Sequence, residues 1–306
     1  MRELQSVPMK RSFDRFLTTH TGSLPRPDSL IRTMFAKEEG VPVDRAALAA
    51  EIGAAVADVV KKQAEAGIDL VNDGEMSKPS YATYIKDRLN GFGGESQPPP
   101  YPDLVAFPGL HQKVYGDRGR ARRKMPGCNG PISVRDREAV KIDIENLKAG
   151  VEAKEGKVED LFISAASPGV VSLFFHNDYY KTHEEYLYAI GDAMQYEYET
   201  IASAGLVLQL DCPDLGLGRH VQFPDLSIEE FRGKAQLHVE ALNHAVRNIH
   251  PSTCECTCAG ATTRRRTKWT YRSPTLSTSS SSPGRVPSPS RRQTRDTRTN
   301  GRSSKR

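Results

Sequence analysis

One arrangement recurs along this chain and constrains its fold more than any other feature. A helix-like segment ends at a glycine, a short apolar run follows at once, and a polar loop comes next. Residues 43–67 show this order: the helical spacing stops at Gly67, the apolar run is Ile68–Val71, and the loop is Asn72-Asp73-Gly74-Glu75. The apolar run is too short to be a helix, so we expect a buried strand there.

The same order returns in the second half of the chain. Residues 182–205 have helical spacing and end at Gly205, the apolar run is Leu206–Leu210, and Asp211 opens the polar loop. LFISAASPG at 161–169 and FLTTHTGSLPRP at 16–27 also indicate strands that end in polar loops. Alternation of helix and strand is typical of parallel βα units.

The length of the chain narrows this α/β class further. Its 306 residues suit a (β/α)8 TIM barrel, whose core needs about 250 residues. A doubly wound parallel sheet is the alternative fold. Both folds bind ligands at the carboxyl ends of their strands. The residues that follow each predicted strand are therefore the candidate site.

Composition excludes several other classes of protein. The chain is 37% hydrophobic and 26% charged, and it contains no apolar run of the roughly 20 residues that a membrane span needs. Its first residues contain no apolar signal segment, and its five cysteines are too unevenly spaced for a disulfide framework. We therefore expect a cytoplasmic protein with no membrane partner.

The charge of the chain is divided unevenly and predicts two regions. Of 43 Lys+Arg and 38 Asp+Glu residues, 13 and one lie from Ala259 onward, which leaves 30 and 37 before it and a formal charge of −7 there. We predict a barrel domain at 1–258, with an irregular Gly- and Pro-rich excursion at 90–135. The Ser/Thr/Arg/Pro-rich tail at 259–306 cannot build a core and is expected to be disordered.

Two carboxylates stand out among the loop residues. Glu75 and Asp211 follow different strands, and two such groups facing one pocket would suit a ligand ammonium group. The alternative is that each carboxylate caps the following helix. The loop THTGSLPRP, with His20 and Gly22, can offer rigid backbone groups to a carboxylate or an amine. A single histidine such as His20 is more often structural than catalytic.

Four segments together resemble a known family. FLTTHTGSLPRP, DLVNDGEMSKPSYATYIKDRLNGFGG, SAASPGVVSLFFHNDYY and LQLDCPDLGLGRH are similar to the C-terminal catalytic domain of cobalamin-independent methionine synthase, and more closely to its short single-barrel relatives. The resemblance covers about residues 14–250 in order. It implies a TIM barrel and an S-methyltransferase that uses homocysteine, a 5-methyltetrahydrofolate-type donor and a zinc ion.

The resemblance also implies roles for individual residues. Substrate binding would fall to six residues, of which the last two would hold the ammonium group: His20, Thr21, Gly22, Ser23, Glu75 and Asp211. Four residues would lie toward the methyl donor: Ser164, Ser167, Asn177 and Tyr179. The resemblance implies small-molecule partners and leaves the catalytic residues unassigned.

The zinc ligands of the family are missing from the written sequence. An HxC pair is due after Asn248, but the chain reads CECTCAGATTRRR at 254–266. Suppose that each true codon begins at the third base of a codon as read, so that the first two bases of each written codon become the last two bases of a true codon. Residues 250–263 then permit PPEHVRMHVCWGNY, and residues 286–304 permit GALSFEAANPRHEHEWKVF. The first contains the expected HVCWGN motif. We infer a frameshift near Ile249, so that no metal ligand is assigned in the written frame.

Several alternatives remain open at the level of sequence. The CxCxC run could be a metal site, although structural zinc sites use wider cysteine spacing. The tail could bind nucleic acid through its phosphates, although it has few aromatic residues for stacking. The enzyme could alkylate another thiol, as an epoxyalkane–coenzyme M transferase does. Finally, the chain as written could be a non-catalytic product.

Overall fold

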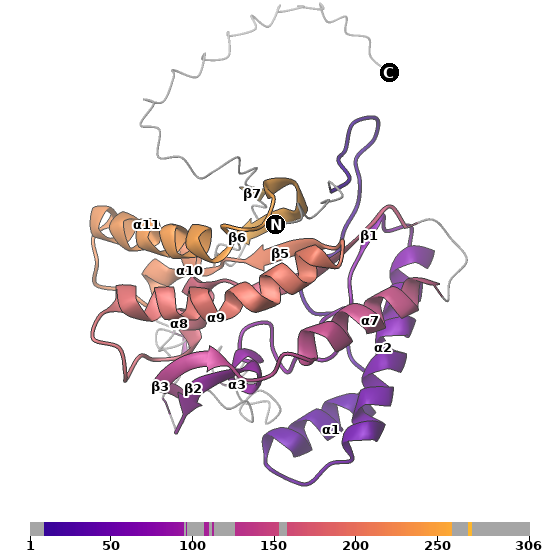
Figure 1. Cartoon of the computed structure of the whole chain (residues 1–306), viewed down its shortest axis with the longest axis horizontal. Helices are drawn as coiled ribbons and strands as arrows, with labels where there is room; N and C mark the ends of the chain where they lie inside the picture. Colours follow the sequence, from indigo (N-terminus) through magenta and orange to yellow (C-terminus); the bar gives the residue numbers. More distant parts are fainter. Residues whose placement is uncertain are drawn as a thin grey trace, which may run out of the picture. The chain divides into compact units, whose positions relative to one another are not determined.

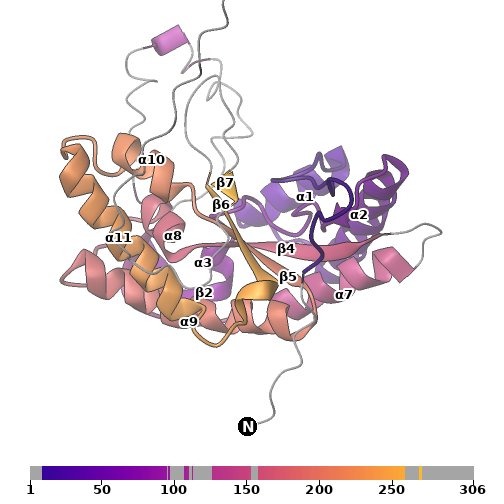
Figure 2. The ribbon, with the colours of Figure 1, turned by 90° about the horizontal axis from the view of Figure 1, so that it is seen from above.

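A parallel sheet lies at the centre of the structure, a computed structural model that describes residues 9–94, 96, 107–109, 112, 126–152, 158–258 and 269–270. Four strands run parallel and lie side by side in the order β1 (Leu70–Val71), β4 (Asp160–Ala166), β5 (Val207–Asp211) and β6 (Cys254–Cys258). The two-residue strand β7 (Trp269–Thr270) pairs antiparallel with β6. Figure 2 shows β4 and β5 in the middle of this arrangement.

The strands are short, and β1, β4 and β5 are mostly buried. Every residue of β5 is buried, as are the last five residues of β4. Continuous apolar strands of this kind occur where helices cover a parallel sheet. The register brings Ala166 opposite Asp211, and Asp211 opposite Thr257, so the carboxyl ends of β4, β5 and β6 meet at one edge.

Four long helices form a row beside the sheet, and each precedes one strand of it. They are α2 (Arg45–Glu65), α7 (Ala139–Glu152), α9 (His183–Ser203) and α11 (Ile228–Ala245). In this row α2 packs on α7, α7 on α9, and α9 on α11, which is the order of the strands that follow them (Figure 1). The repeated helix–strand unit in the sequence therefore becomes a repeated unit in space.

Side-chain caps fix where these helices begin. The Asp44 side chain accepts hydrogen bonds from the backbone of Ala46 and Ala47 at the start of α2. Thr182 caps α9 in the same way, and Ser227 forms a capping box with Glu230 at the start of α11. Gly67 and Gly205 follow α2 and α9 with positive φ angles of 73° and 78°, which glycine adopts without strain.

Shorter helices join these units. They are α1 (Asp28–Glu38), α3 (Ile85–Arg88), α8 (Pro168–Phe174), α10 (Asp214–Val221) and a 3₁₀ turn at Pro251–Thr253. Both α8 and α10 follow directly on a strand of the sheet, which places their first residues beside the carboxyl ends of β4 and β5.

The ends of the excursion at 90–135 are regular. The strand β2 (Leu89–Gly93) pairs antiparallel with β3 (Gly127–Val134) in a separate two-stranded sheet. Gly91 has a φ angle of 94°, and a Cβ atom there would lie 2.8 Å from the Gly130 carbonyl oxygen, so close backbone approach explains the glycines of this stretch. Most of the segment between the two strands lies outside the described residues.

The structure confirms the α/β class with a parallel sheet. The predicted strand at Ile68–Val71 is shorter, and the one at Leu206–Leu210 is displaced by one residue. The segment 16–27 contributes a single parallel bridge, from Thr19 to Leu70. Among the described residues the parallel sheet has the four strands given above, so a (β/α)8 barrel that is incomplete at its C-terminal end stays a prediction. The predicted disorder of the tail falls almost wholly outside the described residues.

The strand β6 consists of the cysteine-rich stretch itself. Its backbone pairs in register with β5 at Leu208–Cys254 and Leu210–Cys256, in the position where the next barrel strand is due. On β6, Thr257 points toward the sheet edge and donates a hydrogen bond to Asp211, whereas Cys254 and Cys256 pack on the hydrophobic core. This alternation is the ordinary consequence of strand geometry. The written sequence thus forms the strand without the family's zinc motif.

Candidate functional site

The loop after β1 holds its acidic residues in an unusual backbone conformation. Glu75 has a φ angle of 58° and is the single non-glycine residue with positive φ in the described part of the chain. Hydrogen bonds from the Gly74 amide to Asn72 Oδ1 (2.7 Å) and from the Glu75 amide to Asp73 Oδ1 (2.9 Å) fix the loop. Positive φ is costly for a glutamate and is often found at functional sites.

The Glu75 carboxylate is buried but only half satisfied. Its exposed fraction is 2%. The Ser23 hydroxyl donates a hydrogen bond to Oε2, while Oε1 is fully enclosed and has no hydrogen-bond partner. Buried polar atoms are nearly always hydrogen-bonded, and each exception calls for an explanation. A ligand that donates a hydrogen bond to Oε1 would supply the missing partner.

A second carboxylate lies at the end of β5. Asp211 accepts hydrogen bonds from Thr257 Oγ1 (2.7 Å) and Gln209 Nε2 (3.3 Å). Burial raises the pKa of its carboxyl to about 6, and the negative charge of Glu75 adds to this rise. The two carboxylates therefore interact electrostatically, and their facing one ligand pocket stays a prediction.

A lysine that sequence analysis did not single out lies among these carboxylates. Lys78 is 1% exposed, its Nζ donates a hydrogen bond to the Ser164 carbonyl oxygen, and it lies 4.7 Å from the centroid of the Tyr84 ring. Its charge lowers the pKa of Asp211 and of Asp73, which partly offsets the effect of burial on both. In the sequence, the one indication that Lys78 belongs to the site was its position three residues after Glu75.

Burial dominates the titration of Asp73. It raises the pKa of the Asp73 carboxyl to about 6; Lys78 lowers the pKa, and the charges of Asp143 and Glu75 raise it. Asp73 and Asp211 therefore hold their protons up to a higher pH than free carboxyl groups do.

We expect this proton binding to make stability depend on pH. Asp73 and Asp211 bind protons more tightly in the folded chain than in the unfolded one, so these two groups make the free energy of unfolding fall as pH rises from about 4 to about 6. His183, whose pKa is lowered to about 4, has the opposite effect and offsets part of this fall. The loss should be on the order of a few kcal/mol. Urea unfolding at several pH values measures it, and Asp73→Asn should flatten the slope. A free energy that rises across this window would contradict the assignment.

The predicted residues at the N-terminal loop lie beside this site but bond mainly to their own loop. His20 Nε2 is 2.8 Å from the Gly22 carbonyl oxygen, and Asn72 Nδ2 donates to the His20 carbonyl oxygen at 3.4 Å. Gly22 has a φ angle of 93°, which explains the glycine, and Thr21 is exposed. Ser23 is the member of this loop that bonds directly to Glu75.

The residues predicted to lie toward the methyl donor divide into two groups. Ser164 belongs to the carboxylate cluster, because its carbonyl oxygen accepts from Lys78 and its hydroxyl accepts from Gln209 Nε2 at 2.9 Å. Ser167 caps α8 by accepting from the Val170 amide. It also donates to Asp214 Oδ1 at 3.0 Å.

Asn177 and Tyr179 lie in a turn after α8. The Asn177 side chain accepts from the amides of Tyr179 and Tyr180 and donates to the Tyr180 carbonyl oxygen, so these bonds shape the turn itself. Tyr179 is 51% exposed. The structure therefore gives both residues a local role, and their contact with a donor stays a prediction.

A buried acid–histidine chain adjoins Ser167 and was also missed by sequence analysis. His238 Nδ1 is 2.8 Å from Asp214 Oδ2, and His238 Nε2 is 2.9 Å from His183 Nε2. Burial lowers the pKa of His183 to about 4. A Cβ atom on Gly169 would lie 2.0 Å from Asp214 Oδ2, so this chain requires a glycine in the SPG sequence. The three side chains come from α9, α10 and α11 and hold these helices together.

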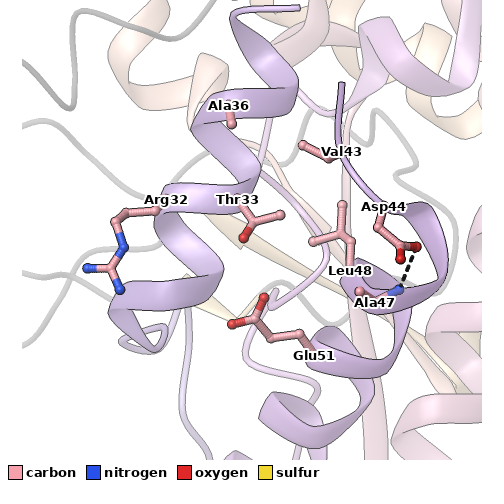
Figure 3. Close-up of a pocket in the computed structure, with 8 residues that line it drawn as sticks. All are labelled: Arg32, Thr33, Ala36, Val43, Asp44, Ala47, Leu48 and Glu51. Carbon is pink, nitrogen blue, oxygen red and sulfur yellow. Dashed lines mark hydrogen bonds between the residues drawn. The ribbon is translucent and has the colours of Figure 1, made fainter. Parts of the chain in front are cut away.

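A cavity elsewhere contributes nothing to this site. It has a volume of about 440 Å³ and lies between α1 and the start of α2. Figure 3 shows Arg32 and Thr33 on one side and Leu48 and Glu51 on the other. Its walls carry both signs of charge and belong to helices, away from the strand ends, so we assign it no role.

The described residues do not fit a zinc ion. Nowhere in the described ranges do three or more His, Cys, Asp or Glu side chains converge so as to hold a metal. Cys254 and Cys256 pack on the core, on the other face of β6 from Thr257. The side chain of Cys258 lies outside what the structure describes.

The length and composition of the helices bear on whether the described part of the chain could span a membrane. Among the helices of the described residues, none combines the length and apolar character needed to cross a membrane.

Sequence comparison identifies relatives of this chain among known proteins. No family profile matches the chain. A methionine synthase of Sulfolobus acidocaldarius is 25% identical over 244 residues, and one of Saccharolobus solfataricus is 24% identical over 247; each match covers 79% of this chain. The chain spans only 61% and 62% of these two curated relatives.

Solved structures give the corresponding likeness in three dimensions. A B12-independent methionine synthase of Shewanella sp. W3-18-1, in complex with selenomethionine, superposes with a TM-score of 0.54 and 19% identity over 79% of this chain and 60% of its own. A putative vitamin-B12-independent methionine synthase of Listeria monocytogenes gives 0.53 and 18% over 84% of this chain and 66% of its own. The chain is a distant relative of the methionine synthases of the B12-independent type.

Proposed function

We propose that this chain is the barrel of an S-methyltransferase that binds the ammonium group of homocysteine between Glu75 and Asp211. The observation that carries the proposal is the enclosed Glu75 Oε1 atom, which has no hydrogen-bond partner among the described residues. An ammonium group has three N–H donors and one positive charge. It would satisfy Oε1 and offset the excess of negative charge in the site.

The charge of the site also distinguishes between thiol substrates. Homocysteine carries an ammonium group, whereas coenzyme M carries a sulfonate and no cation. Buried carboxylates repel an anion and lose their own solvation without compensation. Glu75 and Asp211 therefore favour the amino-acid thiol over the epoxyalkane–coenzyme M type of reaction.

The relatives support the same class of substrate. Curated relatives are named methionine synthases, and the Shewanella protein was solved with selenomethionine, an amino acid. We extend this to the finer features: a TIM barrel over residues 1–258 that is incomplete at its C-terminal end, a methyl-folate donor at the side of Ser164 and Ser167, and a tail at 259–306 that takes no part in the reaction.

Zinc fits this proposal only after correction of the reading frame. Since the described residues do not fit a metal, we derive no step through zinc in the chain as written. We propose that the written chain binds the amino acid but does not methylate it. Sequencing genomic DNA and transcript across codons 245–306 tests the frameshift. A confirmed written frame would make the non-catalytic alternative the correct one.

Calorimetric titration of the full chain tests the amino-acid site. The ligands are L-methionine and 4-(methylthio)butanoate, which has the same carbon chain, carboxylate and thioether but no ammonium group. We expect methionine to bind at least about 30-fold more tightly, since a buried charged hydrogen bond contributes about 2–5 kcal/mol. Equal affinities would overturn the proposal, as would coenzyme M binding more tightly than methionine.

A further inference from the structure

The buried charged side chains near the proposed ammonium site form two sets, one around Arg88 and one around Lys78, which differ in their ratio of cations to carboxylates. Within the described part of the chain, Lys78 and Arg88 are the buried lysine and arginine. Arg88 is fully committed, because it pairs with Asp143 at 2.5 Å and with Glu197 at 2.9 Å. Of the other buried carboxylates, Asp69 pairs with Arg15 and Asp214 lies beside His238. Lys78 is therefore the buried cation among the remaining three, which are Asp73, Glu75 and Asp211.

The Lys78 ammonium group is held so that it cannot follow a ligand. Its Nζ is bonded to the carbonyl oxygen of Ser164 on β4 and lies over the Tyr84 ring at 4.7 Å. The Tyr84 hydroxyl is itself bonded to Glu197 at 2.6 Å. The Arg26 guanidinium donates to the Lys78 carbonyl oxygen at 2.6 Å, which fixes the backbone of the residue.

The charged groups around Lys78 come from every neighbouring element. They are Asp73 and Glu75 in its own loop, Asp211 on β5, Asp143 on α7, Glu197 on α9, Arg88 on α3, and Arg26 before α1, whose guanidinium donates to the carbonyl oxygens of Glu75 and Lys78. Arg88 carries one charge against the two of Asp143 and Glu197, and the Asp143 charge still raises the pKa of Asp73. The fixed charge of Lys78 therefore opposes this charge as well as those of the three carboxylates of the site. It lowers the pKa of Asp73 and Asp211, whereas burial raises it.

We propose that Lys78 is a positioning residue of the amino-acid site: its fixed cation keeps the carboxylates ionised so that they accept the substrate ammonium group. This inference rests on the function proposed above. A protonated carboxyl group cannot accept the same charged hydrogen bond, and its proton must leave before an ammonium group binds. Without Lys78, proton and ammonium would compete up to a higher pH.

Methionine affinity measured against pH tests this role. We expect Lys78→Met to displace the acidic limb of the affinity profile upward by at least about one pH unit, or tenfold weaker binding near about pH 6, with affinity near about pH 8.5 within roughly threefold of the natural chain. Lys78→Arg should restore the limb. The control is Lys86→Met, because Lys86 pairs with Glu38 at 2.9 Å and does not touch the site.

A second measurement needs no ligand. In chains labelled with ¹³C at the aspartate carboxyl carbons, the resonances of the buried aspartates should titrate at higher pH in Lys78→Met than in the natural chain. Unchanged aspartate titration and an unchanged acidic limb would overturn the role of Lys78. Shifted aspartate titration in a chain that binds no methionine at any pH would instead overturn the proposed function. If Lys78→Met weakens binding equally at all pH values and Lys78→Arg does not restore it, the lysine has a purely structural role and the inference is rejected.

Discussion

Glu75→Gln is expected to abolish most of the affinity for methionine while leaving the chain at least as stable as before. Gln has the size of Glu and can still accept the Ser23 hydrogen bond, so the change removes charge and little else. Loss of one partner of a buried charged pair costs about 2–5 kcal/mol, and we expect binding at least about 30-fold weaker. Calorimetric titration measures the effect.

The stability of the same variant is the discriminating control. In the ligand-free chain, Glu75 is a buried carboxylate with one unpartnered oxygen, and it has a positive φ angle. Removing its charge relieves repulsion with Asp211 and Asp73. A residue that merely capped a helix would show the opposite result, with stability lost and affinity kept. Glu65→Gln, on the exposed side of α2, should change neither quantity.

The sequence predicted the acidic part of this site because the rule behind it concerns the backbone. In parallel βα units the loops after the strands meet at one edge, whichever side chains they carry. Glu75, Asp211, Ser23 and Ser164 follow from that rule alone. The glycines that end α2 and α9 made the strand positions easy to locate.

What the pattern could not predict depends on how side chains turn within a loop. Because lysine is seldom buried, nothing in the sequence indicated that the Lys78 side chain lies among buried carboxylates. Ser167 and Asn177 are loop residues like Ser164, yet their hydrogen bonds shape a helix cap and a turn. The His183–His238–Asp214 chain joins residues 24 and 55 positions apart in sequence, and local periodicity carries no such information.

The largest loss of stability should follow from the other buried cation. We expect Arg88→Met to lower the free energy of unfolding by about 3–5 kcal/mol, because it leaves Asp143 and Glu197 buried without a counter-charge. Glu197 also accepts from Tyr84, whose hydroxyl accepts from the Ala166 amide at the end of β4. The loss should therefore loosen the strand end that carries the site. Urea unfolding measures it.

Two further variants separate charge from packing in this result. Arg232→Met removes an exposed ion pair with Glu229 and should cost at most about 1 kcal/mol. Adding Asp143→Asn and Glu197→Gln to Arg88→Met should recover part of the lost stability, since the uncompensated charges are then gone. If the triple variant is less stable than the single one, the packing of the arginine side chain, rather than its charge, stabilises this part of the chain. Lys78 and Arg88 both lie over the Tyr84 ring, which links the Arg88 network to Lys78. The two buried cations therefore together stabilise the residues around the site.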